Sequence, residues 1–163
     1  MEQHSGPFAD QPQAGARPRT LTWLCTASFV NQALVFPLYL TGIAVAYAMR
    51  SMPDAELQQM VVDAWSGFVQ PGQQDELMAY IGMLKAHGPA LMGIFALRTL
   101  ARFIGTLRMW QGRSDGFHIY TSAQLLGMLL PIFVAGPRTI NFLGFILALN
   151  WCYLYFIHRK TLR

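Results

Sequence analysis

Charged residues are scarce in this sequence of 163 residues. They make up 12% of it, which is about half of the usual share, whereas hydrophobic residues make up 53%. A soluble protein carries charge along every element, because each element has a face in water. The scarcity of charge therefore argues against a soluble domain.

Recognised catalytic and metal-binding motifs are also missing. The two cysteines, Cys25 and Cys152, have neither CxxC nor zinc spacing, and no HExxH or Walker-type motif occurs. No Ser, His and carboxylate share a depth in the apolar stretches that would suggest acyl transfer. The formal net charge is +4, but the basic residues form no patch typical of nucleic-acid binding. We therefore expect a protein that is not an enzyme, uses no cofactor or metal and binds no nucleic acid.

Long apolar stretches are what the sequence does contain, at residues 21–49, 88–110, 117–135 and 139–158. Each has about the length, roughly 20 residues, that a helix needs to cross a bilayer. None of them contains Asp or Glu. The first run exceeds the apolar core of a signal peptide, about 7–15 residues, so we expect a retained span. The pattern predicts an all-α polytopic membrane protein, with four transmembrane helices in an antiparallel bundle.

The connections between the stretches alternate in charge. Segment 50–76 holds five acidic residues and one basic residue, Arg50, whereas the other flanks are mainly basic. By the positive-inside rule, both termini and the connection near Arg113 face the cytoplasm. The acidic segment is then expected on the outer side of the membrane.

Two regions outside the stretches have recognisable patterns. Apolar spacing predicts an outer amphipathic helix over about residues 54–69. It is expected either to lie in the outer membrane interface or to cover the outer end of the bundle, and its acidic polar face favours the second position. Residues 1–20 are rich in Pro, Gly and Gln and are expected to be a disordered cytoplasmic arm, which leaves residues 21–163 as the transmembrane domain. Pro37 predicts a bend, and Gly88-Pro89 predicts a kink or a break.

Two short motifs carry a family resemblance. They are residues 17–25 with Ser28-Phe29, and residues 107–113 continuing through 116–120 to Gln124-Leu125. They resemble motifs of a family of small four-span bacterial membrane proteins common in Bacteroidota, in which Met-Trp, basic residues and Gly-Phe-x-x-Tyr join the second and third spans. The resemblance covers most of the chain. It implies the four-span fold and a place in the bacterial plasma (inner) membrane, and it implies no activity. The acidic outer helix and the arginines of the second stretch depart from the family pattern.

Those arginines are the strongest candidates for a binding site. Arg98 and Arg102 share a helix face and lie about 18 and 12 Å from the end at Trp110. A charge at mid-bilayer costs roughly 2.5–3.5 kcal/mol. Either the side chains extend to the cytoplasmic headgroups, or they face an interior polar layer, or the span lies nearer residues 78–99. A partner protein that supplies the acidic groups is a further explanation.

Four amide side chains lie at a similar depth, Asn31, Gln32, Gln124 and Asn150. They are expected either to form hydrogen bonds between helices, worth about 0.6 kcal/mol each, or to complete a pocket for an anionic headgroup. The small residues Gly144 and Ala148 are spaced for close helix packing.

Two functions are compatible with these features. The first is a small non-catalytic membrane protein that acts as a scaffold or accessory subunit of a membrane complex, through a membrane-protein partner or a second copy. The alternative is a binder or carrier of an anionic lipid or small anion through Arg98 and Arg102. The lipid bilayer surrounds the protein in either case.

Overall fold

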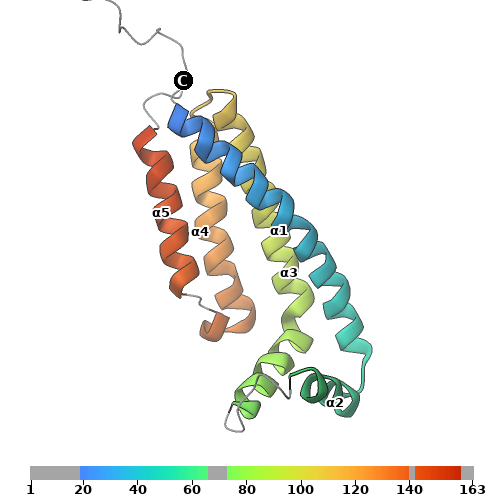
Figure 1. Ribbon diagram of the computed structural model, residues 1–163. Coiled ribbons are helices and arrows are strands. Elements are labelled where there is room, and N and C mark those ends of the chain that lie inside the picture. Colours follow the sequence, from blue (N-terminus) through green and yellow to red (C-terminus); the bar gives the residue numbers. More distant parts are fainter. Residues whose placement is uncertain (1–18, 66–72, 140–141, 159–163) are drawn as a thin grey trace, which may run out of the picture.

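The regular elements in the described part of the chain are helices. The computed structural model describes residues 19–65, 73–139 and 142–158. In chain order the elements are α1 (Arg19–Ser51), α2 (Asp54–Trp65), α3 (Gln74–Trp110), α4 (Asp115–Ala135), the short 3₁₀ helix η1 (Pro137–Thr139) and α5 (Phe142–His158), as Figure 1 shows. The predicted all-α class is confirmed. Residues 1–18 of the predicted arm and 66–69 of the predicted outer helix lie outside the described residues, and residues 19 and 20 belong to α1.

Three of the helices are long and apolar enough to cross a membrane, namely α1, α3 and α4. The fourth apolar helix, α5, has 17 residues and is about 25 Å long, somewhat less than a hydrocarbon core of about 30 Å. The predicted stretch 139–158 began too early, because Thr139 belongs to η1. The structure therefore supports three candidate spans and one shorter apolar helix.

Helices α1, α3, α4 and α5 form the bundle and run in alternating directions, with α3 packed between α1 and α4 (Figure 1). Helix α5 packs less extensively, against α4 and α1. Residues 111–114 join α3 to α4 at the end of the molecule where α1 begins and α5 ends, and we call this the Gly112 end. The opposite end, where α2 lies, is the α2 end.

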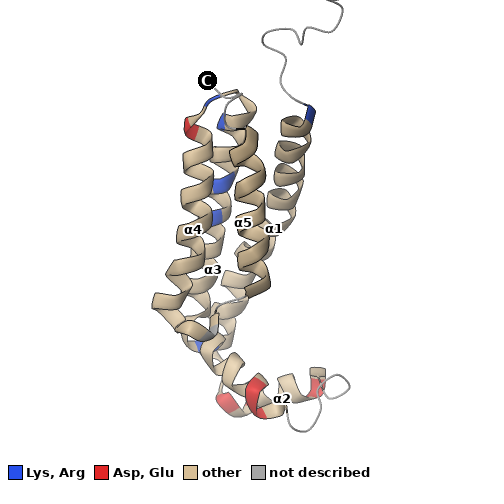
Figure 2. Ribbon diagram, turned by 90° about the vertical axis from the view of Figure 1, so that its left-hand side faces the viewer, with Lys and Arg blue, Asp and Glu red and all other residues tan. Residues whose placement is uncertain are grey.

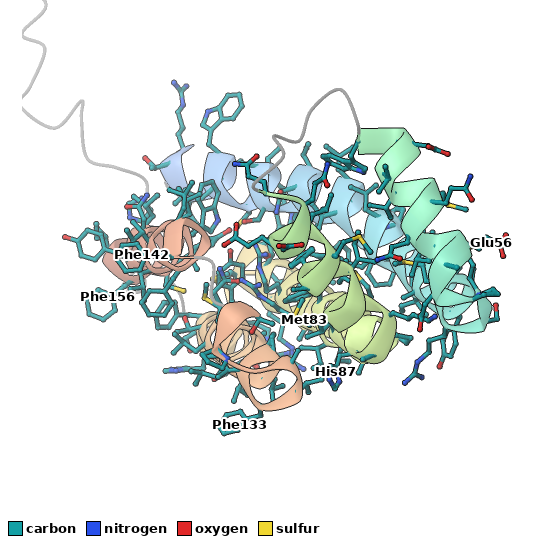
Figure 3. All side chains as sticks on the ribbon, turned by 90° about the horizontal axis from the view of Figure 1, so that it is seen from below. Glu56, Met83, His87, Phe133, Phe142 and Phe156 are labelled. Atoms are coloured by element: carbon teal, nitrogen blue, oxygen red, sulfur yellow. The ribbon has the colours of Figure 1, made fainter. Side chains whose placement is uncertain are left out.

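The surface of this bundle is apolar. Large hydrophobic side chains are exposed along every long helix, with Trp23 73% and Phe133 84% exposed. Phe133 and Phe156 point away from the bundle in Figure 3. An exposed apolar belt of this extent is expected of helices in contact with lipid rather than water.

Charge gathers at the two ends and on α3 (Figure 2). The acidic side chains of α2 and of the start of α3 lie at the α2 end, whereas Arg108 and Arg113 lie near the Gly112 end beside Asp115. Arg98 and Arg102 of α3 lie between the two ends, and blue positions are visible along α3 in Figure 2.

Prolines do not interrupt the long helices. Helix α1 continues through Pro37 and α3 through Pro89, so of the two outcomes predicted for Gly88-Pro89, a kink or a break, the break does not occur. Tertiary contacts support α3 at this point. A Cβ on Gly88 would lie 2.9 Å from the Ala46 Cβ, so the missing side chain lets α1 pack closely. Arg50 also donates to the carbonyl of Ala86 at 2.9 Å, beside the turn in which Pro89 removes a hydrogen bond.

Helix α2 lies to one side of the bundle. It sits beside the part of α3 that projects past α4 and α5, and it does not cover their ends (Figures 1 and 3). Lys85 of α3 anchors its start, donating to the Met52 carbonyl at 2.7 Å and to the Asp54 carboxylate at 2.5 Å. Leu57 is buried, but Trp65 and most of the predicted apolar face are exposed. The expectation that this helix covers the outer end of the bundle is therefore wrong for the described residues, because α2 follows the projecting part of α3.

Candidate functional site

The turn between α3 and α4 fixes the register of the site. Gly112 has φ +82°, a left-handed conformation that closes the end of α3, and the Gly112 amide donates to the Met109 carbonyl at 2.9 Å. Arg108 forms an ion pair with Asp115 across the turn, and Arg113 contacts the same carboxylate at 3.1 Å. These contacts bring α3 and α4 together as antiparallel neighbours.

Glycines then allow the two helices to touch backbone to backbone. A Cβ on Gly105 would lie 2.7 Å from the backbone nitrogen of Tyr120, and a Cβ on Gly116 would lie 2.6 Å from the Gly105 carbonyl oxygen. Such separations are shorter than real Cβ contacts. The pair Gly105 and Gly116 therefore forms a glycine interlock, which sets Tyr120 of α4 against α3.

Arg102 of α3 contacts the Tyr120 side chain that this packing brings close. Its Nη2 donates to the Tyr120 hydroxyl at 3.1 Å, and the guanidinium carbon lies 5.2 Å from the centre of the Tyr120 ring. Both interactions stabilise a cation, but Tyr120 is neutral and leaves the charge uncompensated. The Arg102 Nε is buried and has no hydrogen-bond partner. Arg102 thus faces other helices, as the interior-layer explanation requires, instead of extending along α3 to the headgroups.

Arg98 lies one helical turn further from the Gly112 end. Its aliphatic stem packs on Gly127 of α4, where an added Cβ would overlap the Arg98 side chain. The Arg98 Nε is buried without a hydrogen-bond partner, and no ion pair joins Arg98 or Arg102 to a carboxylate in the described part of the chain. Two like charges four residues apart on one helix also repel each other.

A network of hydroxyls joins α1 to α5 nearby. The Ser28 and Tyr155 hydroxyls lie 2.9 Å apart, and the Trp151 indole donates to the Ser28 oxygen at 2.9 Å. The Tyr155 hydroxyl is also within 3.1 Å of the Leu24 carbonyl. Sequence reasoning missed these three side chains, since each reads as an ordinary residue of an apolar helix. The only sequence feature that could have identified them is that they lie at the same depth in the helices as the predicted amides.

A cavity of about 350 Å³ lies between these groups. All four helices of the bundle contribute to its lining, which consists of Ser28, Asn31, Arg102, Gln124, Gly144, Leu147, Ala148 and Trp151. Gln124 is only 4% exposed, and its Oε1 has no hydrogen-bond partner. A volume roughly ten times that of one water molecule, lined by one cation and two amides, is large enough for a small ligand.

The predicted polar residues divide into two groups. Asn31, Arg102 and Gln124 line the cavity together, with Gly144 and Ala148 on the α5 side. The other three lie elsewhere. Gln32 is buried and donates to the Thr106 hydroxyl at 3.3 Å, Arg98 packs on Gly127, and Asn150 is exposed on α5.

The arrangement is suited to binding an anion. The cavity provides guanidinium N–H groups from Arg102 and amides from Gln124 and Asn31, which donate or accept. Hydrogen bonds from a charged donor to an anionic acceptor are about twice as strong as neutral ones. Ser28 is already engaged with Tyr155 and Trp151, so it contributes to the walls more than to recognition.

Fold and cavity together define a small helical protein with three candidate membrane spans and a polar site between its helices. Comparisons with models of known protein families, with curated proteins and with solved structures found no match to this chain.

Proposed function

We propose that this chain is a four-span protein of the bacterial inner membrane that binds an anionic group in the cavity beside Arg102. One observation carries the proposal: Arg102 lines a cavity of about 350 Å³ while its charge has no acidic partner among the described residues. Binding is the function the geometry supports best, and the anion is the missing counter-charge.

The membrane arrangement rests on length and charge. Helix α5 is shorter than the bilayer core by only a few ångström, a mismatch that costs fractions of a kcal/mol per ångström and is relieved by local thinning of the bilayer. The Gly112 end carries Arg19, Arg108 and Arg113 with one acidic residue, Asp115, whereas the α2 end carries Arg50 and Lys85 with Asp54, Glu56, Asp75 and Glu76. We therefore propose that the Gly112 end and both termini face the cytoplasm.

The energetic reason for a ligand is the cost of a buried charge. A cation near mid-bilayer costs roughly 2.5–3.5 kcal/mol on insertion scales. The contacts to Tyr120 offset part of this cost and supply no negative charge. An anion within hydrogen-bond reach of Arg102 compensates the charge in a medium of low dielectric constant, where such attraction is strongest.

Thermal unfolding in a neutral detergent tests the proposal. Phosphatidylglycerol is the anionic probe, and phosphatidylcholine is the zwitterionic control. At about 100 times its dissociation constant a ligand stabilises the folded state by roughly 2.7 kcal/mol. For a chain of this size this corresponds to a rise in Tm of about 5–11 °C.

The matched variants are Arg102→Gln and Arg98→Gln, which remove the same charge from the same face of α3. Only Arg102 lines the cavity, so Arg102→Gln is expected to abolish the difference between the two lipids and Arg98→Gln to retain most of it. Equal stabilisation by both lipids in the unmodified chain, or equal loss in both variants, would contradict a site at Arg102.

A second function, that of an accessory subunit, is favoured by Asn150. Its side chain is exposed on α5 and makes no hydrogen bond to another described residue, and Leu149 and Tyr153 beside it are exposed too. A polar group left unpaired in an apolar medium costs about 1–3 kcal/mol, and amides join transmembrane helices in neighbouring chains. We therefore propose this face of α5 as a contact for a helix of a membrane-protein partner or of a second copy.

Native mass spectrometry of the protein extracted gently from its own membrane tests the subunit proposal. Asn150→Leu is expected to release a partner chain or a second copy. Phe133→Leu is the control, because Phe133 is exposed on α4, away from α5. A chain that is monomeric both before and after the change would reject the contact.

A further inference from the structure

Access to the cavity is restricted at the Gly112 end. The buried side chains Leu21, Cys25, Met109, Tyr120 and Tyr155 form one cluster. In each helix they lie between the Gly112 end and the cavity residue of that helix: Leu21 and Cys25 precede Ser28 in α1, for example, and Tyr155 follows Trp151 in α5. Because these side chains are at most 1% exposed, a layer of packed groups separates the cavity from this end of the molecule.

The cavity is more open between α1 and α5. Among the lining residues, Gln124 of α4 is buried and Arg102 of α3 is half-buried. Asn31 of α1 and Leu147 of α5 are both exposed, Leu147 by 57%. The hydrogen bonds described between α1 and α5 are those of Ser28, Leu24, Tyr155 and Trp151, and they form the wall of the cavity that faces the Gly112 end. From there the two helices diverge toward the α2 end (Figure 1). The exposed lining residues Asn31 and Leu147 therefore place the lateral opening of the cavity between α1 and α5.

The sides of this opening are apolar. On α1, Leu34 and Leu38 follow Asn31 at helical spacing and are both exposed. On α5, Leu143 lies one turn before Leu147 and is exposed as well. If the charged group of a molecule binds at Arg102, the rest of the molecule extends out of the cavity between two apolar surfaces, one on α1 and one on α5.

We infer that the ligand is an anionic amphiphile that enters sideways from the bilayer, between α1 and α5, with its acidic headgroup at Arg102 and Gln124 and its acyl chain against the two rows of leucines. This inference rests on the proposed function and specifies its ligand. The headgroup chemistry is an oxygen anion, a phosphate diester or a carboxylate, and its source is the membrane rather than the aqueous solution.

Fluorescence of Trp151 tests the route, because its side chain lines the cavity. The full chain is reconstituted in phosphatidylcholine nanodiscs with Trp23, Trp65 and Trp110 each replaced by Phe, which leaves one of the four tryptophans. Phosphatidylglycerol brominated on its acyl chains is added, since bromine quenches tryptophan on contact. Phosphatidylcholine with the same brominated chains is the control lipid, and brominated oleate presents a carboxylate in place of the phosphate.

Brominated phosphatidylglycerol or oleate is expected to quench Trp151 more than brominated phosphatidylcholine does at equal mole fraction, and the stronger of the two anions identifies the headgroup. Arg102→Gln should weaken the apparent affinity by about tenfold or more, the effect of losing a charge-assisted hydrogen bond. Arg102→Lys, which keeps the charge, should retain the preference for the anionic lipid, so a folding defect is distinguishable from loss of the site.

Inorganic phosphate in the aqueous phase distinguishes failure of the lateral route from failure of the proposed anion binding. If phosphate alone raises the Tm, and does so only when Arg102 is present, the site binds anions but is reached from water, and the lateral route is overturned while the proposed function stands. If no anionic probe acts in a way that depends on Arg102, the proposed function itself fails. Equal quenching by all brominated lipids would likewise overturn the inference, because the opening would then take up acyl chains without recognising the headgroup.

Discussion

Replacing Gly105 by Ala tests the packing that holds the site together. The new Cβ would lie 2.7 Å from the Tyr120 nitrogen, 2.9 Å from the Gly116 carbonyl oxygen and 3.0 Å from the Tyr120 Cα. All three are backbone atoms, so no side chain can rotate out of the way. The α3–α4 pair must separate by several tenths of an ångström to accept one methyl group.

The magnitude follows from a comparison with a second glycine of the same helix. A Cβ on Gly93 would meet no atom within 4 Å. Both substitutions gain about 1 kcal/mol of helix propensity, and this gain cancels when the two variants are compared. The difference that remains is the overpacking cost, about 1–3 kcal/mol. For a chain of 163 residues this corresponds to a difference in Tm of about 2–12 °C.

The assay is thermal unfolding of the two purified variants in the same neutral detergent, followed by the loss of helical circular dichroism. Gly93→Ala is expected to unfold at or above the temperature of the unmodified chain, and Gly105→Ala below it. If Gly105→Ala unfolds at the same temperature as Gly93→Ala or higher, α3 and α4 are not in backbone contact, and the glycine interlock does not exist in solution.

Three further predictions concern the other contacts. Tyr155→Phe removes the hydroxyl bonded to Ser28 and should lower the free energy of unfolding by about 1 kcal/mol, measured by the same unfolding assay. Gly127→Ala should destabilise the fold, because the added Cβ would overlap the Arg98 Cδ and lie 2.9 Å from the Arg98 Cβ, which the α3 backbone holds in place; a double-mutant cycle with Arg98→Ala should show coupling, and independent effects would refute the contact. Lys85→Ala should change global stability by less than about 1 kcal/mol while speeding amide hydrogen exchange in α2, whose start it anchors.

The helices were largely predictable from the sequence. Length and the lack of charge located α1, α4 and the second half of α3, and glycines in left-handed conformations, Gly112 and Gly136, end α3 and α4. The position of α2 was not predictable, because it depends on Lys85 in the projecting part of α3. An acidic amphipathic pattern indicates a helix but does not say which neighbour it follows.

The sequence predicted how far along the helices the residues of the candidate site lie, but not which way their side chains point. Counting residues from the helix ends placed the amides and Arg102 in one layer, since each residue advances a helix by about 1.5 Å. Neighbouring residues, however, point about 100° apart, and a helix that is apolar all round gives no signal for its orientation. Asn31 and Gln32 are adjacent, yet Asn31 lines the cavity and Gln32 bonds Thr106 on α3. The same limit left the roles of Tyr120, Ser28 and Trp151 unseen.

The glycine interlock also connects stability with binding. The atoms that a Cβ on Gly105 would displace belong to Tyr120, the residue whose hydroxyl holds Arg102 at 3.1 Å. That separation is already near the upper limit of a good hydrogen bond, so a shift of several tenths of an ångström between α3 and α4 would break it. The guanidinium would then lose its fixed position in the cavity, although neither arginine had been changed. Close packing at Gly105 and Gly116 is therefore as much a requirement of the proposed site as the charge of Arg102.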